Sequence, residues 1–170
     1  LALLMAAGLS GSALAQLGKA PDGLCFDDEG RLYVNSFLSR SIVILDAVSL
    51  LLSLDTSLKV LDEVVVSTQE KLGTAVLRGK RLFYDASDTR MSQDGYLSCA
   101  SCHLDGFEDG TVWDFTDRGE GLRNTTSLLG KRGTGQGPLH WTANFDEVQD
   151  FEHDIRGPFG GTGFLNLSPQ

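Results

Sequence analysis

The sequence predicts a chain of mixed α and β class, in which a small N-terminal antiparallel β-meander precedes a mostly α, loop-rich domain. Short apolar runs separated by turn residues predict the meander, and apolar residues at helical spacing over 74–84 predict a helix. A long region rich in glycine and aspartate follows this helix. We therefore expect an apolar segment at 1–20, the meander at 21–67 and the second domain at 73–170.

The first segment is the apolar run LALLMAAGLSGSALAQ, which ends in Ala13-Leu14-Ala15. A small-x-small ending is the pattern of a signal-peptidase site and would fit export. No lysine or arginine precedes the run, so two alternatives stay open: a truncated signal peptide, or a strand or helix of a preceding domain. The run is short and interrupted by glycine, and we expect no stable membrane span in the chain.

The meander is expected from three strand-like runs at 24–26, 31–37 and 41–45, with turns at 28–30 and 38–40. The β-branched run in VLDEVVVSTQE predicts one more strand. Cys25 lies among apolar neighbours in the first run, and we expect it to be an inert core thiol because free cysteine packs as a small hydrophobe.

The stretch PDGLCFDDEGRLYVNSFLSRSIVILD resembles one blade of the YVTN-type β-propellers, through the glycine, leucine and aromatic positions of its first two strands and the Ile-x-Ile-Leu-Asp of its third. One blade cannot close a propeller, because closure needs several blades around an axis. The resemblance therefore implies either further blades or a meander that packs elsewhere.

The helix is predicted over TAVLRGKRLFY, where Val76, Leu77, Leu82 and Phe83 are apolar and basic residues lie between them. The glycine- and aspartate-rich region beyond it has little periodicity, so we expect it to pack around a large object. Its last part, GPFGGTGF, lacks the Lys-Ser/Thr of a phosphate-binding loop and is expected to be a flexible turn.

The motif Cys99-x-x-Cys102-His103 predicts what this glycine- and aspartate-rich region packs around. Cys-x-x-Cys-His is the attachment site of c-type haem, in which two thiols form thioethers with the porphyrin and the histidine ligates iron. A zinc site would need a second ligand pair, and a thioredoxin-type site would need a βαβ context, and neither pattern is present in the sequence. We therefore expect haem c, with His103 as the proximal iron ligand.

The flanks of this motif, from Arg78 to Trp141, resemble the bacterial di-haem cytochrome c peroxidases, including the cytochromes fused behind β-propellers. The matching elements are Gly79-Lys80-x-Leu82-Phe83, Arg90-Met91-Ser92, Ser98-Cys99-x-x-Cys102-His103, Asp109-Gly110, Arg123-Asn124-x-x-Ser127-Leu128 and Trp141. The resemblance implies a cytochrome c-like haem domain in which Trp141 lies between two haems. One haem motif is present, so it also implies a second haem domain or a redox partner protein.

The sixth iron ligand decides between electron carrier and enzyme, because an open position permits chemistry. No methionine follows Cys102, and Met91 would reach the iron only if its loop folded back over the ring. No histidine lies between 104 and 122, where the peroxidases place their distal ligand. His140 is therefore either the distal ligand or a structural histidine beside Trp141, whereas His153 lies between two acidic residues and is expected to be a solvated helix residue.

Arginines are the candidate partners of the haem propionates, because guanidinium binds carboxylates through paired hydrogen bonds. Arg118, Arg123 and Arg156 qualify, and Arg123 is the choice because it lies inside the family motif. The net charge of −9 excludes a basic nucleic-acid footprint.

The function expected from these residues is electron transfer by a c-type cytochrome domain located in the periplasm or another extracytoplasmic place. Two alternatives stay open: peroxidase-type reduction of hydrogen peroxide, and a partner-binding β-propeller protein that carries a haem domain.

Overall fold

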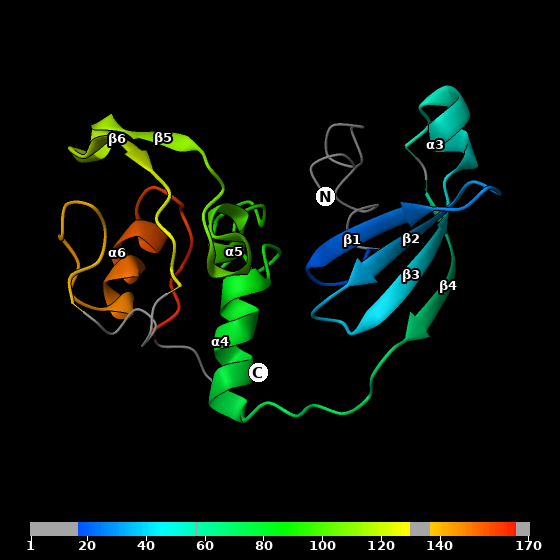
Figure 1. The fold of residues 1–170 in the computed structure, drawn as a ribbon, viewed down its shortest axis with the longest axis horizontal. Coiled ribbons are helices and arrows are strands. Elements are labelled where there is room, and N and C mark those ends of the chain that lie inside the picture. The colour runs from blue at the N-terminus through cyan, green and yellow to red at the C-terminus, as the bar shows by residue number, and fades with distance from the viewer. Residues whose placement is uncertain (1–16, 57, 130–136, 166–170) are drawn as a thin grey trace. The chain divides into compact units, whose positions relative to one another are not determined.

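The computed structural model describes residues 17–56, 58–129 and 137–165 and divides the chain into two units, Leu1–Leu77 and Arg78–Gln170 (Figure 1). Most of the predicted apolar segment at 1–20 lies outside the described residues, as does the side chain of Arg118. In the described part of the chain, no helix is long and apolar enough to cross a membrane.

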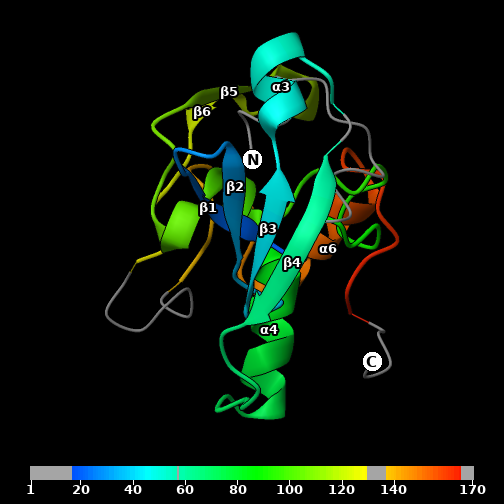
Figure 2. The same ribbon diagram turned by 90° about the vertical axis from the view of Figure 1, so that its right-hand side faces the viewer.

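The first unit contains a four-stranded antiparallel sheet in which the strands follow one another in sequence order (Figure 2). Its strands are β1 (Pro21–Phe26), β2 (Arg31–Ser36), β3 (Ser41–Asp46) and β4 (Lys59–Val65), and the helix α3 (Val48–Ser53) lies between the last two in sequence. The predicted meander and its additional strand are thus confirmed.

The core of this unit lies on one face of the sheet. Side chains of a strand alternate between faces, and the pairs Leu32–Leu45 and Val34–Val43 place four buried residues on the same face. Four further buried residues from outside the sheet complete the cluster: Leu17, Ala47, Leu50 and Leu58.

The prediction that Cys25 is a core thiol is wrong, because its side chain is exposed. Cys25 pairs with Tyr33, whereas its neighbour Leu24 pairs with the buried Val34. The alternation along β1 therefore turns Leu24 towards the core and Cys25 towards the opposite face.

The turn between β1 and β2 is held by one carboxylate. Asp27 accepts hydrogen bonds from the backbone N–H groups of Glu29 and Arg31, from Arg31 Nε and from the Tyr33 hydroxyl. Desolvation by partial burial raises the pKa of Asp27, but these hydrogen bonds outweigh it and lower the pKa from 3.8 to about 2. The ionised carboxylate therefore stabilises the turn.

This lowered pKa predicts how the turn responds to acid. A carboxyl group whose pKa is lower in the folded state stabilises it fully above the unfolded pKa of 3.8, and the contribution is lost as the pH falls towards about 2. We expect Asp27→Asn to lower the amide-exchange protection of Glu29 and Arg31 at neutral pH, and the difference from wild type to shrink in acid. Equal protection at neutral pH would contradict this role.

The second unit consists of short elements joined by loops. In chain order these are α4 (Thr74–Tyr84), which begins in the first unit, α5 (Cys99–Cys102), η1 (Leu104–Gly106), β5 (Val112–Phe115), η2 (Thr116–Arg118), β6 (Gly121–Asn124), η3 (Val148–Asp150) and α6 (Phe151–Arg156). The helix predicted over 74–84 is confirmed, and so is the loop-rich character. The antiparallel β5–β6 hairpin is a difference from the mostly helical expectation.

Candidate functional site

The two cysteines of the haem motif lie on one short helical turn. α5 consists of Cys99–Cys102, and its end is closed by the His103 N–H, which donates to the carbonyl of Cys99 at 2.9 Å. At its start, the Ser98 N–H donates to Ser101 Oγ at 3.0 Å. Ser101 thus satisfies one of the amides that a helix start leaves unpaired, as in a capping box, and this stabilises the short turn.

His103 has one ring nitrogen that is buried without a partner. Among the residues that the structure describes, its Nδ1 is the one buried side-chain nitrogen or oxygen that has no hydrogen-bond partner. A buried polar atom left in this way costs about 1–3 kcal/mol. A bound group that gave this nitrogen a partner would remove the cost, so the orphaned atom fits a side chain that contacts a ligand.

Both thiols are partly buried, Cys99 more deeply than Cys102. Burial raises the pKa of Cys99, and burial together with the negative charge of Asp109 raises the pKa of Cys102. Both are therefore neutral S–H groups at pH 7 and act as small apolar side chains until thioether formation consumes the S–H bond.

An apolar surface follows the motif. Leu104, Phe107 and Leu129 are large apolar side chains that are 62%, 52% and 55% exposed. The carbonyl of Gly106 accepts a hydrogen bond from the Leu128 N–H at 2.8 Å, which brings residues 128–129 against the turn at 104–107. Together with the orphaned nitrogen of His103, this surface fits a porphyrin ring attached at Cys99 and Cys102.

The end of α4 is linked to the turn that follows the motif. The Tyr84 hydroxyl donates to Asp105 Oδ1 at 3.3 Å, and Asp105 has a left-handed backbone with φ of 51°. Non-glycine residues adopt this conformation rarely and only where their surroundings hold it. The chain therefore reverses sharply after His103.

Arg123 and Trp141 lie together although 18 positions separate them in the sequence. They line a pocket of about 340 Å³ with Leu122 and Asn124. Trp141 Nε1 donates to the carbonyl of Asn124 at 2.9 Å, yet the side chain is 64% exposed. The structure thus places an arginine and an accessible indole at one site, next to the β6 strand.

His140 lies in an aromatic cluster. Its ring centroid is 4.6 Å from that of Phe145 and 4.7 Å from that of Phe151, and its Nδ1 is 3.0 Å from Asn144 Oδ1. Glu120 Oε1 lies 4.0 Å from the same nitrogen. These contacts hold the imidazole in one orientation, and among the described residues they include none of the haem motif.

The remaining candidates have separate places. Met91 is buried, at 6% exposure, whereas His153 is exposed on α6. Arg156 Nε donates to Glu152 Oε1 at 2.5 Å and is engaged there. The sequence analysis missed Ser92, which is fully buried and contacts the residue before Ser98; its only signal in the sequence was its place in the Arg90-Met91-Ser92 match.

Comparison with known proteins identifies one family. The family model described as Di-haem cytochrome c peroxidase matches residues 74–160, which is just over half of the chain and contains the whole haem motif. No curated protein and no solved structure matches the chain.

This match gives the cofactor, which is a covalently bound c-type haem with its iron. It also extends beyond the region of the sequence resemblance, since it begins at the first residue of α4 and ends past α6. The chain belongs to the di-haem cytochrome c peroxidase family.

Proposed function

We propose that the chain carries electrons through one haem c, bound by thioethers to Cys99 and Cys102 and ligated at its iron by His103. The observation that supports this most is the single helical turn α5 with the orphaned His103 nitrogen beside it. When bound, the haem supplies the redox centre. The residues of the chain attach it, orient the proximal imidazole and cover the ring.

His140 is our proposed distal iron ligand. Histidines that ligate metals usually have their other ring nitrogen fixed by a hydrogen bond, which sets the orientation of the ring. His140 Nδ1 has such a partner in Asn144 Oδ1, which leaves Nε2 as the ligating nitrogen. Two nitrogen ligands close both axial positions, and this favours an electron carrier over peroxide chemistry.

Peroxide reduction is the second candidate, and the exposed Trp141 favours it. An indole that is 64% exposed beside Arg123 suits contact with a further haem domain or a redox partner protein, from which electrons would reach this haem. This function requires an open sixth position on the iron. The two candidates therefore differ in one measurable property, the spin state of the haem.

The first unit supports a further proposal, that it is one blade of a β-propeller that binds a partner. Propeller blades are four-stranded antiparallel sheets, and β1–β4 form such a sheet in consecutive order. In that case the propeller would bind the partner, and the haem domain would serve as a reporter or an anchor.

The proposed place of the protein is outside the cytoplasm, because haem c is attached there in this family. We expect cell fractionation to find haem-stained protein in the periplasmic or extracellular fraction, with a cytoplasmic enzyme as the marker for leakage. Haem-loaded protein found only with the cytoplasmic marker would refute this localisation.

A further inference from the structure

Residues Phe159–Gly163, which follow α6, pair with the loop that precedes the haem motif. The Gln93 N–H donates to the carbonyl of Phe159 at 2.9 Å, and the Gly163 N–H donates to the carbonyl of Arg90 at 2.9 Å. The two segments are therefore bonded at both ends of the contact. This ordered pairing differs from the flexible turn that the glycines led us to expect.

Gly161 allows the two backbones to approach. A Cβ atom at this position would lie 2.9 Å from the carbonyl carbons of both Arg90 and Met91, closer than real Cβ atoms come to any neighbour. Both are backbone atoms, so a side chain here would displace the loop rather than rotate a neighbour aside. The Gly161 N–H also donates to the carbonyl of Ile155 in α6 at 2.8 Å, which holds the segment from its other side.

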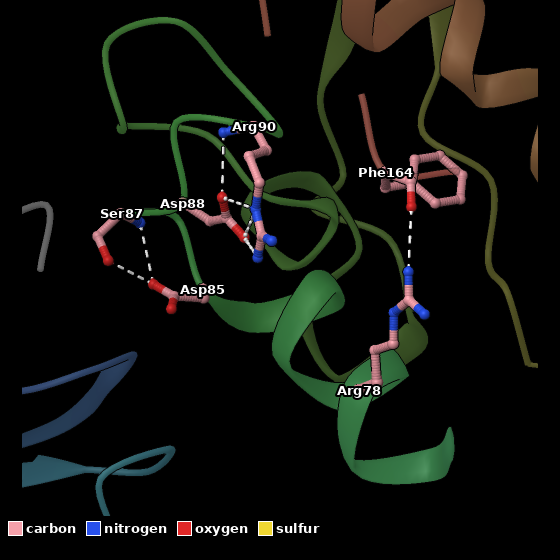
Figure 3. Close-up of polar contacts among 6 residues, drawn as sticks. All are labelled: Arg78, Asp85, Ser87, Asp88, Arg90 and Phe164. Carbon is pink, nitrogen blue, oxygen red and sulfur yellow. Dashed lines mark hydrogen bonds and ion pairs between the residues drawn. The ribbon is translucent and has the colours of Figure 1, made fainter. Parts of the chain in front are cut away.

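The far end of the segment is anchored by Glu152 of α6. Its Oε2 accepts the N–H of Phe164 at 2.7 Å, and its Oε1 accepts Arg156 Nε at 2.5 Å. Burial raises the pKa of Glu152, but the hydrogen bonds from Arg156 and from the backbone of 164–165 outweigh it and lower the pKa, so the carboxylate is charged at neutral pH. Arg78 of α4 donates to the carbonyl of Phe164 at 3.4 Å (Figure 3).

The loop on the other side of the pairing is stiffened locally. The Asp88 carboxylate binds the guanidinium of Arg90 (Figure 3). Arg90 Nε lies 2.7 Å from Asp88 Oδ1, and Nη2 lies 2.5 Å from Oδ2. Asp85 accepts the Ser87 hydroxyl at 2.5 Å in the same loop. The carbonyl of Arg90 therefore belongs to a fixed part of the chain.

Ser92 connects this loop to the haem motif. The residue is fully buried, and its Oγ lies 3.2 Å from both the N–H and the carbonyl oxygen of Leu97, with which it exchanges hydrogen bonds. Leu97 is followed by Ser98, whose N–H is bonded to Ser101 inside the motif. A continuous series of contacts thus runs from Gly161 to the turn that holds Cys99.

We propose that Phe159–Gly163 is a positioning element for the haem, with Gly161 as its decisive residue. The segment fixes residues 90–93 and, through Ser92 and Leu97, sets where the thioether-bearing turn lies and how far water reaches the ring. This inference rests on the proposed attachment of haem at Cys99, Cys102 and His103.

Gly161→Ala in the haem-loaded protein tests the proposal, with Gly79→Ala in α4 as the matched control. A Cβ atom at Gly79 would meet nothing within 4 Å, and alanine is the better helix former there. We expect Gly161→Ala to speed amide exchange of Gln93 and Leu97 by about tenfold or more, the factor that about 1.4 kcal/mol of lost local stability produces. The control should exchange as wild type does.

The midpoint potential of the haem distinguishes a segment that positions the haem from one that only stabilises the fold. Water near the ring favours the more highly charged ferric state, so a loosened loop should lower the potential of Gly161→Ala below that of wild type and control. A segment that only stabilises the fold would leave the potential of the folded protein unchanged. Glu152→Gln keeps the side-chain length and should change the amide-exchange rates and the midpoint potential in the same directions as Gly161→Ala does, but by less. This variant provides the test if Gly161→Ala does not fold.

Two different results would overturn the proposed function and the positioning role. Wild-type protein without covalent haem would overturn the proposed function itself. Haem-loaded Gly161→Ala and Glu152→Gln that match wild type in exchange and potential would overturn the positioning role and leave the proposed function intact.

Discussion

Cys99→Ala combined with Cys102→Ala should abolish covalent haem, so that the protein band on a denaturing gel no longer stains for haem after export with a maturation system. The two thiols supply the only thioethers expected on α5, and removing both leaves nothing to hold the porphyrin once the chain is denatured. The single variants should keep part of the stain, because one thioether remains.

Cys25→Ala is the matched control for this experiment. It is the same substitution at an exposed thiol in the other unit, and it should stain as strongly as wild type. His103→Ala should retain covalent haem but lose the normal axial ligation, seen as a changed Soret spectrum. An unstained wild-type band under these conditions would refute haem attachment.

His140→Ala should convert a low-spin ferric haem to a high-spin one at neutral pH. Ligation by both His103 and His140 would leave cyanide and peroxide no free site on the iron. The alanine variant opens that site, so ligand binding and peroxide reaction should appear together. Absorption and electron paramagnetic resonance spectra measure the change directly.

His153→Ala is the control for His140, because its imidazole is exposed on α6. Its spectrum should remain that of wild type. The wild-type haem could instead be high-spin already and turn over peroxide with an external electron donor. That result would overturn the proposal of an electron carrier and establish peroxidase activity as the function.

Local patterns in the sequence predicted the elements whose formation depends on residues close together in the chain. Short apolar runs bounded by turn residues predicted β2 and β3, and the spacing of Val76 to Phe83 predicted α4 with the bounds that the structure gives. The haem motif was equally visible, because its spacing lies within one helical turn. These features depend on residues that are neighbours in the chain.

The features that sequence analysis missed depend on tertiary contacts. The run Leu24-Cys25-Phe26 has no polar residue to mark its outer face, so nothing in it showed that Cys25 is exposed. β5 and β6 are four residues each, too short to give a clear period of two. The close approach of Gly161 to Arg90 joins positions 71 residues apart, and no local pattern encodes it.

The placement of both thiols within α5 has a consequence for how the domain unfolds. Two thioethers three positions apart close only a very small ring, so the cross-link restrains the unfolded chain far less than a bridge between distant residues would. Stabilisation by haem must therefore come from burial of the ring and from axial ligation. Because the ring stays tethered when these contacts break, its return is an intramolecular event at high effective concentration, and the occupancy of the folded site is independent of dilution.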